Sequence, residues 1–196
     1  MNRASISPAL WVLSVVALVS GVGLVALSAW SRPLAEGREA ADAGRLEQAL
    51  EHYAAGEARF DRVPVTKQIL PAAYHGTVAN QLLLQYRLRR YDDLLEKAAT
   101  SPSIAPVHFW AGSALFAKAS NEEDAQLRLG WLGRAVEEFR KALERTPDDW
   151  DTKYNYELAS RLLEELRKQP KTPPKQMLQL LRPDPKMGGR PGRRVG

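Results

Sequence analysis

The residues that could do chemistry are few in this chain of 196 residues, and none of them stands in a catalytic or metal-binding pattern. The three histidines, His52, His75 and His108, are far apart and lie outside the H-E-x-x-H frame that binds zinc. Cysteine is absent, which excludes disulfides, thiolate metal ligands and a thiol nucleophile. The sequence also lacks G-x-S-x-G and Walker A motifs. We therefore expect no enzyme activity, no cofactor and no metal site.

A cluster of acids at Asp148, Asp149 and Asp151 is the densest group of possible metal ligands. It lacks the glycine turn and the later glutamate that complete an EF-hand loop. Acidic residues at a helix start accept hydrogen bonds from free N–H groups and complement the helix dipole. The cluster therefore predicts the start of a helix, which Leu158, Leu162 and further leucines continue.

The first hydrophobic element is the run from Ala9 to Trp30, which holds 22 residues without a charge. About 20 apolar residues in a helix span a bilayer, so residues 9–31 are predicted to be a transmembrane anchor after a flank at 1–8. A cleaved signal peptide is the alternative, because Ala26-Leu27-Ser28 is an acceptable cleavage site. Basic residues on both sides of the run leave its orientation open.

The net charge of +5 arises from the C-terminal segment 169–196, which has seven basic residues and one acid. The remaining chain is close to neutral, so it offers no basic stripe for nucleic acid, and we expect no nucleic-acid partner. Six prolines in the segment predict a disordered, extended tail. The tail contains one apolar island, which either docks on the folded domain or is a linear motif for a partner's groove. The island comprises Met177, Leu178, Leu180 and Leu181.

Between these ends, residues 32–168 show helical periodicity without alternating strand patterns, which predicts an all-α domain. Its small and aromatic residues follow the spacing of tetratricopeptide repeats, in which small residues let two antiparallel helices cross closely and an aromatic fills the gap beside them. We expect an array of hairpins, with 63–71 as an irregular connector, 80–90 as one helix and an extra stretch of 11 residues at 120–130. The predicted packing positions are Gly37, Gly44, Ala49, Tyr53, Gly112, Ala135, Phe139, Ala142 and Pro147.

The segment PDDWDTKYNYELA at 147–159 resembles one that closes the repeat region of small anchored proteins of the MxaK and BatC-like family. Genes for this family lie beside those for MoxR-type AAA+ ATPases and von Willebrand factor A domain proteins. The likeness covers about 107–183, and its motif residues are Asp149, Trp150, Asp151, Tyr154, Asn155, Glu157 and Leu158.

What this resemblance implies is an accessory role with no catalytic residues. The protein would be a single-pass protein of a bacterial inner membrane, with its helical domain in the periplasm. There it would bind von Willebrand factor A proteins and help a MoxR system to assemble an envelope enzyme or load it with metal. Two other functions stay open: a metal-binding or hydrolytic factor using a histidine, and a structural subunit whose anchor, with Ala17 and Gly21, is the main contact.

Overall fold

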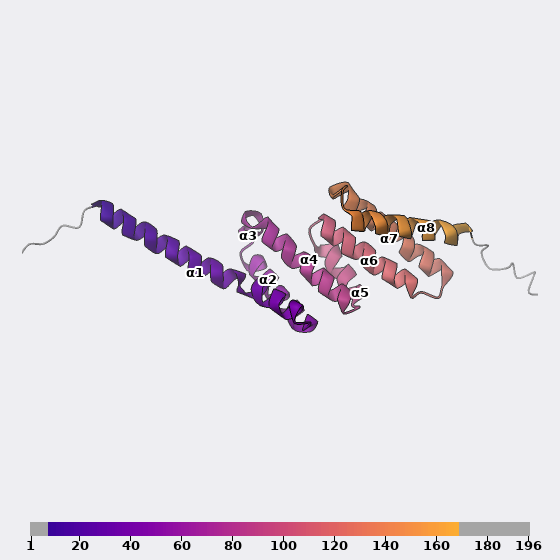
Figure 1. Ribbon diagram of the computed structural model, residues 1–196, viewed down its shortest axis with the longest axis horizontal. Helices are drawn as coiled ribbons and strands as arrows, with labels where there is room; N and C mark the ends of the chain where they lie inside the picture. Colours follow the sequence, from indigo (N-terminus) through magenta and orange to yellow (C-terminus); the bar gives the residue numbers. More distant parts are fainter. Residues whose placement is uncertain (1–7, 169–196) are drawn as a thin grey trace, which may run out of the picture.

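The computed structural model describes residues 8–168, except for the side chains at 8–10, 19, 22–27, 29 and 30. The predicted N-terminal flank, the C-terminal tail and its apolar island therefore lie outside the described residues. Helices follow one another along the described chain, and no strand occurs in it (Figure 1). They are α1 (Pro8–Asp42), α2 (Leu46–Arg62), α3 (Val65–Ile69), α4 (Pro71–Arg87), α5 (Tyr91–Thr100), α6 (Ala105–Ser120), α7 (Ala125–Arg145) and α8 (Trp150–Lys168).

The first helix is continuous across the predicted border between the anchor and the domain. Its 35 residues include Pro33, which lies inside the helix and is buried. The N-terminal half of α1 projects from the molecule, and its side chains at Trp11, Leu13 and Leu18 are 66–69% exposed (Figure 1). Within the part of the chain that the structure describes, no helix meets the length and hydropathy that a membrane crossing requires.

The helices pack as antiparallel hairpins in chain order. The C-terminal part of α1 pairs with α2, α4 pairs with α5, and α6 pairs with α7. Each hairpin also packs on the next one, because α2 contacts α4 while α4 and α5 contact α6. The last helix, α8, lies against α7 and α6. This confirms the predicted all-α class and hairpin arrangement.

The helix ends follow local chemistry. Proline lies in the first turn of α4 and of α6, where a missing N–H group costs nothing. Asp124 caps α7, since its carboxylate accepts hydrogen bonds from the backbone N–H groups of Gln126 at 2.8 Å and Leu127 at 2.9 Å. Asp149 does the same for α8, accepting from the N–H of Asp151 at 3.2 Å. The predicted capping role of the acidic cluster therefore holds at Asp149.

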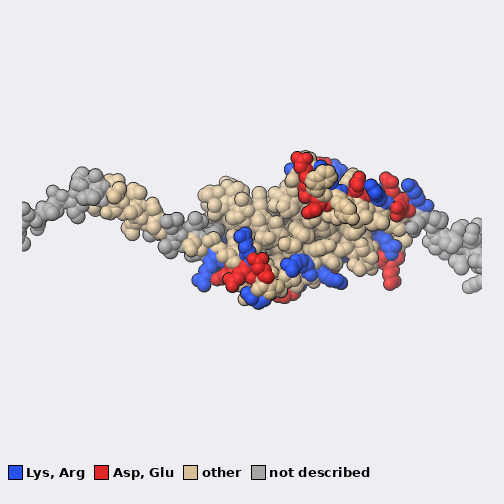
Figure 2. All heavy atoms as spheres, viewed as in Figure 1, with Lys and Arg blue, Asp and Glu red and all other residues tan. Residues whose placement is uncertain are grey.

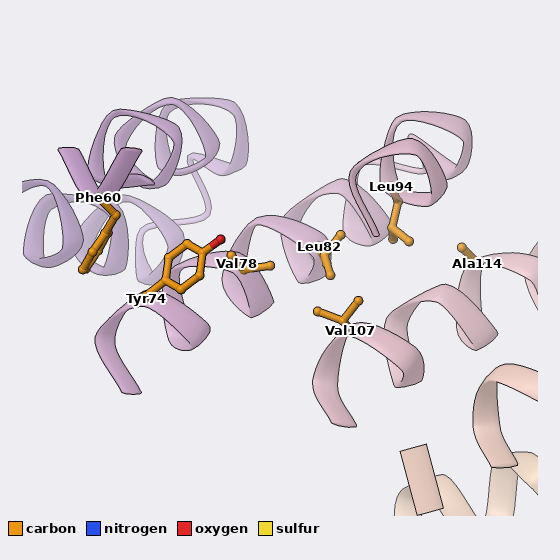
Figure 3. Packing of buried hydrophobic residues seen from close by; sticks show 7 residues of the cluster. All are labelled: Phe60, Tyr74, Val78, Leu82, Leu94, Val107 and Ala114. Carbon is orange, nitrogen blue, oxygen red and sulfur yellow. The ribbon is translucent and has the colours of Figure 1, made fainter. Parts of the chain in front are cut away.

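The hydrophobic core is a series of small clusters rather than a single centre. The largest cluster joins α2, α4, α5 and α6, and its fully buried members include Phe60, Val78, Leu82 and Leu94 (Figure 3). Other clusters lie between α1, α2 and α4 and between α6, α7 and α8. Each cluster is shared by neighbouring hairpins, as expected when every hairpin leaves one apolar face to be covered by the next.

Two expected boundaries were wrong. The region 63–71 is not irregular throughout, because it contains the short helix α3, and Pro71 begins α4. The helix expected at 80–90 starts nine residues earlier, at Pro71, and ends at Arg87. Proline at the first position of α4 has its φ angle already fixed near the helical value, so it starts this helix and does not break it.

Candidate functional site

Close contact between glycine and an aromatic ring fixes two of the hairpins. A Cβ atom added to Gly37 on α1 would lie 3.1 Å from the ring of Tyr53 on α2. One added to Gly112 on α6 would lie 2.8 Å from the ring of Phe139 on α7. Both rings are at least 95% buried, so the two helices approach as closely as the rings permit. The predicted small and aromatic positions thus meet at these crossings.

Two of the predicted alanines belong to the core clusters of these rings, Ala49 with Tyr53 and Ala135 with Phe139. Ala49, Ala135 and Ala142 are each at most 1% exposed. Gly44 instead forms the turn between α1 and α2. Its φ angle is +75°, which residues other than glycine rarely adopt. Pro147 is exposed in the loop before α8. These positions organise the scaffold and offer no group for chemistry.

The motif residues of α8 divide into two sets. Asp149 binds the helix start and the Thr152 hydroxyl, which donates to its carboxylate at 2.5 Å. Trp150 and Tyr154, in contrast, are 77% and 69% exposed. The Nζ atom of Lys153 lies 4.7 Å from the centre of the Trp150 ring, a cation–π contact. The other motif residues lie at the surface or half-buried: Asp151, Asn155, Glu157 and Leu158.

This exposure sets α8 apart from the other helices of the domain. Among the described residues beyond α1, every other aromatic side chain is buried or half-buried. Trp150 and Tyr154 are four positions apart, so they project from the same side of the helix. An exposed pair of large rings is the kind of surface that protein partners bury, because tryptophan and tyrosine dominate interface energetics.

A chain of hydrogen bonds brings together residues whose relation the sequence analysis missed. Ser103 Oγ lies 2.8 Å from His108 Nε2, and His108 Nδ1 lies 2.7 Å from Glu138 Oε2. Arg145 donates to the carbonyl oxygen of Ser103 at 2.8 Å and to its Oγ at 2.5 Å. Lys141 Nζ binds the other oxygen of Glu138 at 2.8 Å. The network joins the loop before α6 to one side of α7.

A groove of about 300 Å³ lies between α5, α6 and α7 beside this network. Small and apolar side chains line it, including Ala98, Ala111 and Leu115. Burial by itself raises the pKa of the Glu138 carboxyl, but the hydrogen bonds from His108 and Lys141 outweigh burial, so its pKa lies below the ordinary value. A carboxylate held charged in this way fixes the orientation of the imidazole.

The other two histidines take part in separate local contacts. His52 Nδ1 lies 3.3 Å from Glu36, and the His75 ring packs 5.9 Å from the ring of Tyr74. The structure therefore does not bring the three histidines together. In the described part of the chain, no three side chains of the kinds that bind metals are close enough to hold an ion.

A second polar network stabilises the join between the first two hairpins. Glu57 on α2 accepts hydrogen bonds from Gln81 at 2.7 Å and from Lys97 at 2.6 Å. The side chains of Glu57 and Lys97 are about one-fifth exposed, and Gln81 is buried. A buried amide requires such partners, so this network serves packing between hairpins.

Comparison with known proteins finds no matching protein family, curated protein or solved structure.

Proposed function

We propose that the protein is a membrane-tethered helical scaffold. It would act by binding other proteins and not by catalysis. The observation that carries the proposal is the exposed pair Trp150 and Tyr154 on α8. Exposed aromatic rings on a rigid helix can be buried by a partner at little cost in side-chain entropy. The stacked hairpins hold α8 in place through its contacts with α7 and α6.

The class of partner follows from the resemblance of the segment 147–159 to the MxaK and BatC-like family. We expect a von Willebrand factor A domain protein, acting with a MoxR-type ATPase in the assembly or metal loading of an envelope enzyme. The repeat spacing of Gly37, Ala49 and Tyr53 supports a tetratricopeptide-like array. Such arrays commonly present extended binding surfaces.

Co-purification tests this proposal directly. The full chain should recover a von Willebrand factor A protein from detergent extracts, and the double variant W150A/Y154A should lower recovery at least tenfold. A control removes two apolar side chains that are also exposed but lie on α3, in the variant V65A/I69A. Equal recovery by both variants, or recovery of this chain alone, would contradict the proposal.

The tether itself is supported by the uncharged run at 9–30 and by the exposed apolar side chains of α1. We assign the helical domain to the periplasm of a bacterial inner membrane, as the family resemblance implies. Protease added to intact spheroplasts should then cut the C-terminal tail, whereas a cytoplasmic domain would be cut only after the membrane is opened.

The chain Ser103–His108–Glu138 favours a second candidate function, hydrolysis of an ester. With Nδ1 protonated and bound to Glu138, His108 Nε2 can take the proton of Ser103 Oγ as that oxygen attacks the ester carbonyl carbon. The imidazolium then returns this proton to the leaving alkoxide, and water releases the acid by the same route. The groove would hold the acyl group.

An esterase assay separates the two candidates. Wild-type protein should hydrolyse p-nitrophenyl butyrate under the second candidate, and Ser103→Ala should abolish the activity while leaving the melting curve nearly unchanged. If Ser103→Ala hydrolyses the ester as fast as wild type, the network serves only to fix the loop before α6 to α7.

A further inference from the structure

We infer that α3 and the residues beside it lie in the headgroup region of the membrane and hold the helical domain against the lipid surface. The inference deepens the proposed function, since it rests on the tether assigned to α1. The contact surface consists of three apolar side chains, Val63, Val65 and Ile69, and its occupant is a phospholipid bilayer.

These three side chains point away from the hydrophobic core. Val63, Val65 and Ile69 are 41%, 53% and 67% exposed. Val65 and Ile69 are four positions apart, so they project from the same side of α3. The short helix has no buried residue, which means that its apolar side chains contribute little to the packing of the domain. An exposed apolar patch on a small helix of this kind marks a contact with a partner or with a membrane.

The contacts between α1 and α2 set the level of this patch along α1. A Cβ atom added to Gly37 would lie 3.1 Å from the ring of Tyr53, and one added to Gly56 would lie 2.8 Å from the side chain of Leu34. Three residues back along α1 thus match three residues forward along α2, as expected for antiparallel helices. The last turn of α2 is therefore level with residues 28–31 of α1.

This level coincides with the end of the uncharged run. The run of 22 residues stops at Trp30, and Arg32 is the first charged residue after it. As a helix the run is about 33 Å long, close to the thickness of the hydrocarbon core. Helix α3 begins shortly after α2 ends, and it lies at the end of the domain from which the N-terminal half of α1 projects (Figure 1). With α1 across the bilayer, α3 therefore lies at the border between lipid and water.

The charges near α3 are compatible with a lipid surface. Residues 62–91 contain no aspartate or glutamate, so α3 and α4 offer no acid that would repel anionic headgroups. Asp61, just before this stretch, pairs with Lys67 at 2.7 Å, and Lys67 Nζ also lies 4.6 Å from the centre of the Tyr74 ring. Arg62 is exposed at the end of α2. Apolar side chains beside basic ones are typical of helices that lie in the membrane interface.

A second contact with the membrane fixes the orientation of the domain. A single helix would let the domain rotate about the axis of α1, whereas contact at α3 holds one side of it against the lipid. Helix α8, which carries Trp150 and Tyr154, lies at the far end of the array from the N-terminal half of α1 (Figure 1). Contact at α3 therefore keeps this aromatic pair away from the bilayer and open to a protein partner.

Fluorescence quenching on the full chain in nanodiscs of phosphatidylcholine and phosphatidylglycerol tests the inference. The sequence has no cysteine, so a single introduced cysteine can carry the fluorophore NBD. A nitroxide on the acyl chain near the headgroup should quench NBD on Val65→Cys and Ile69→Cys roughly fivefold more than NBD on Leu127→Cys. Leu127, near the start of α7, is a matched control because it is 54% exposed and Val65 is 53% exposed.

Two further measurements separate this contact from the tether itself. Ile69→Asp should lower quenching of the label at residue 65 to that at residue 127, whereas Leu127→Asp should leave it unchanged; both replace exposed side chains, so the fold is kept. NBD on Val16→Cys, in the exposed part of α1, reports the tether through nitroxides deep in the acyl chains.

Quenching at residue 16 without quenching at 65 and 69 would overturn the inference and leave the tether standing. Absence of quenching at all three positions would overturn both. Equal quenching at residues 65 and 127 would also overturn the inference, because the domain would then have no preferred side toward the lipid. So would quenching at 65 that survives in Ile69→Asp.

Discussion

Gly37 and Gly112 set the distance between paired helices. The effect of substituting Gly112 can be compared with that of Gly133, which has open space beside it. Substituting Gly112 by alanine places a Cβ atom 2.8 Å from the buried ring of Phe139, so the helices must move apart. We expect a loss of about 1–3 kcal/mol in unfolding free energy. Gly133, on α7, has no atom within 4 Å of an added Cβ.

Gly133→Ala is therefore the matched control. It should stabilise the protein by about 0.5–1 kcal/mol, because alanine loses less backbone entropy in a helix. Thermal unfolding followed by circular dichroism measures both variants. A Gly112→Ala protein as stable as wild type would mean that α6 and α7 do not cross at Phe139.

The carboxylate of Glu138 predicts how stability depends on pH. Its pKa is lower in the folded protein than in the unfolded chain, so its contribution is complete above the unfolded pKa of about 4.3. That contribution is lost as pH falls through the lower, folded pKa. Glu138→Gln should therefore flatten the decline of the unfolding midpoint in urea below about pH 4.3. An unchanged decline in this variant would show that the carboxylate gains nothing from His108 and Lys141.

Of the residues that spacing placed at helix crossings, Gly37, Ala49 and Tyr53 meet at one, but Gly44 and Pro147 lie in turns. The three that meet lie on the two helices of one hairpin, so their contact depends only on helix geometry and turn length. The polar network was not predicted. Ser103, His108 and Glu138 meet because α7 passes the loop before α6 at a particular register. That register is set by packing between the helices of the longer third hairpin. The sequence alone does not specify this packing.

The turns of the first two hairpins have the same backbone form with different residues. Gly44 has a φ angle of +75° and Arg89 one of +58°. In both turns the next residue donates its N–H to the carbonyl five positions earlier, from Arg45 to Ala40 at 2.8 Å and from Arg90 to Gln85 at 2.9 Å. The second hairpin thus keeps the turn of the first without its glycine.

This difference makes Arg89 a site for stabilisation. The left-handed conformation costs an L-residue with a side chain about 1–2 kcal/mol. Glycine avoids this cost, but part of the gain is offset because its unfolded backbone has more entropy to lose. Arg89→Gly should raise the unfolding free energy by about 0.5–1 kcal/mol, measured by urea denaturation. Arg87→Gly, at the last residue of α4, should lower it instead, because that residue is helical. A rise in both variants would contradict this account of the turn.

Ala142, on α7, is a buried small residue that we expect to tolerate no larger side chain. This alanine is 1% exposed, so Ala142→Leu must force the helices apart and should cost about 1–3 kcal/mol. Ala125→Leu, at the exposed start of α7, should be nearly neutral. Circular dichroism melting compares the two, and a normally stable Ala142→Leu would place the crossing elsewhere.

Helix existence was easier to predict than helix length. The 11 additional residues of the third hairpin extend the end of α6 and, mostly, the start of α7, with a slightly longer turn capped by Asp124. The sequence alone could not assign them, because SNEEDAQLRLG is compatible with loop or helix. The second hairpin differs more, since Leu82 and Leu94 replace the small residues and are both fully buried.

Stability along the array should follow contacts between neighbours, because each core cluster joins helices of successive hairpins. The described side chains in the N-terminal half of α1 take no part in these clusters, whereas Leu34, Gly37 and Ala40 cover the first hairpin. Helix α1 is therefore divided into an exposed N-terminal part and a C-terminal part that packs on the domain. This division gives a prediction for truncated chains.

A chain that starts at residue 33 should unfold at nearly the same temperature as the full chain, since the described side chains that it loses are exposed, as is the ion pair of Arg32 with Glu36. A chain that starts at residue 43 should be clearly less stable, because Ala49 and Tyr53 lose their covering helix. Differential scanning fluorimetry compares the two. The chain from residue 33 should also retain its protein partner. If it stays folded but loses that partner, the anchor and not α8 makes the decisive contact, which is the outcome expected for a structural subunit of a larger membrane complex.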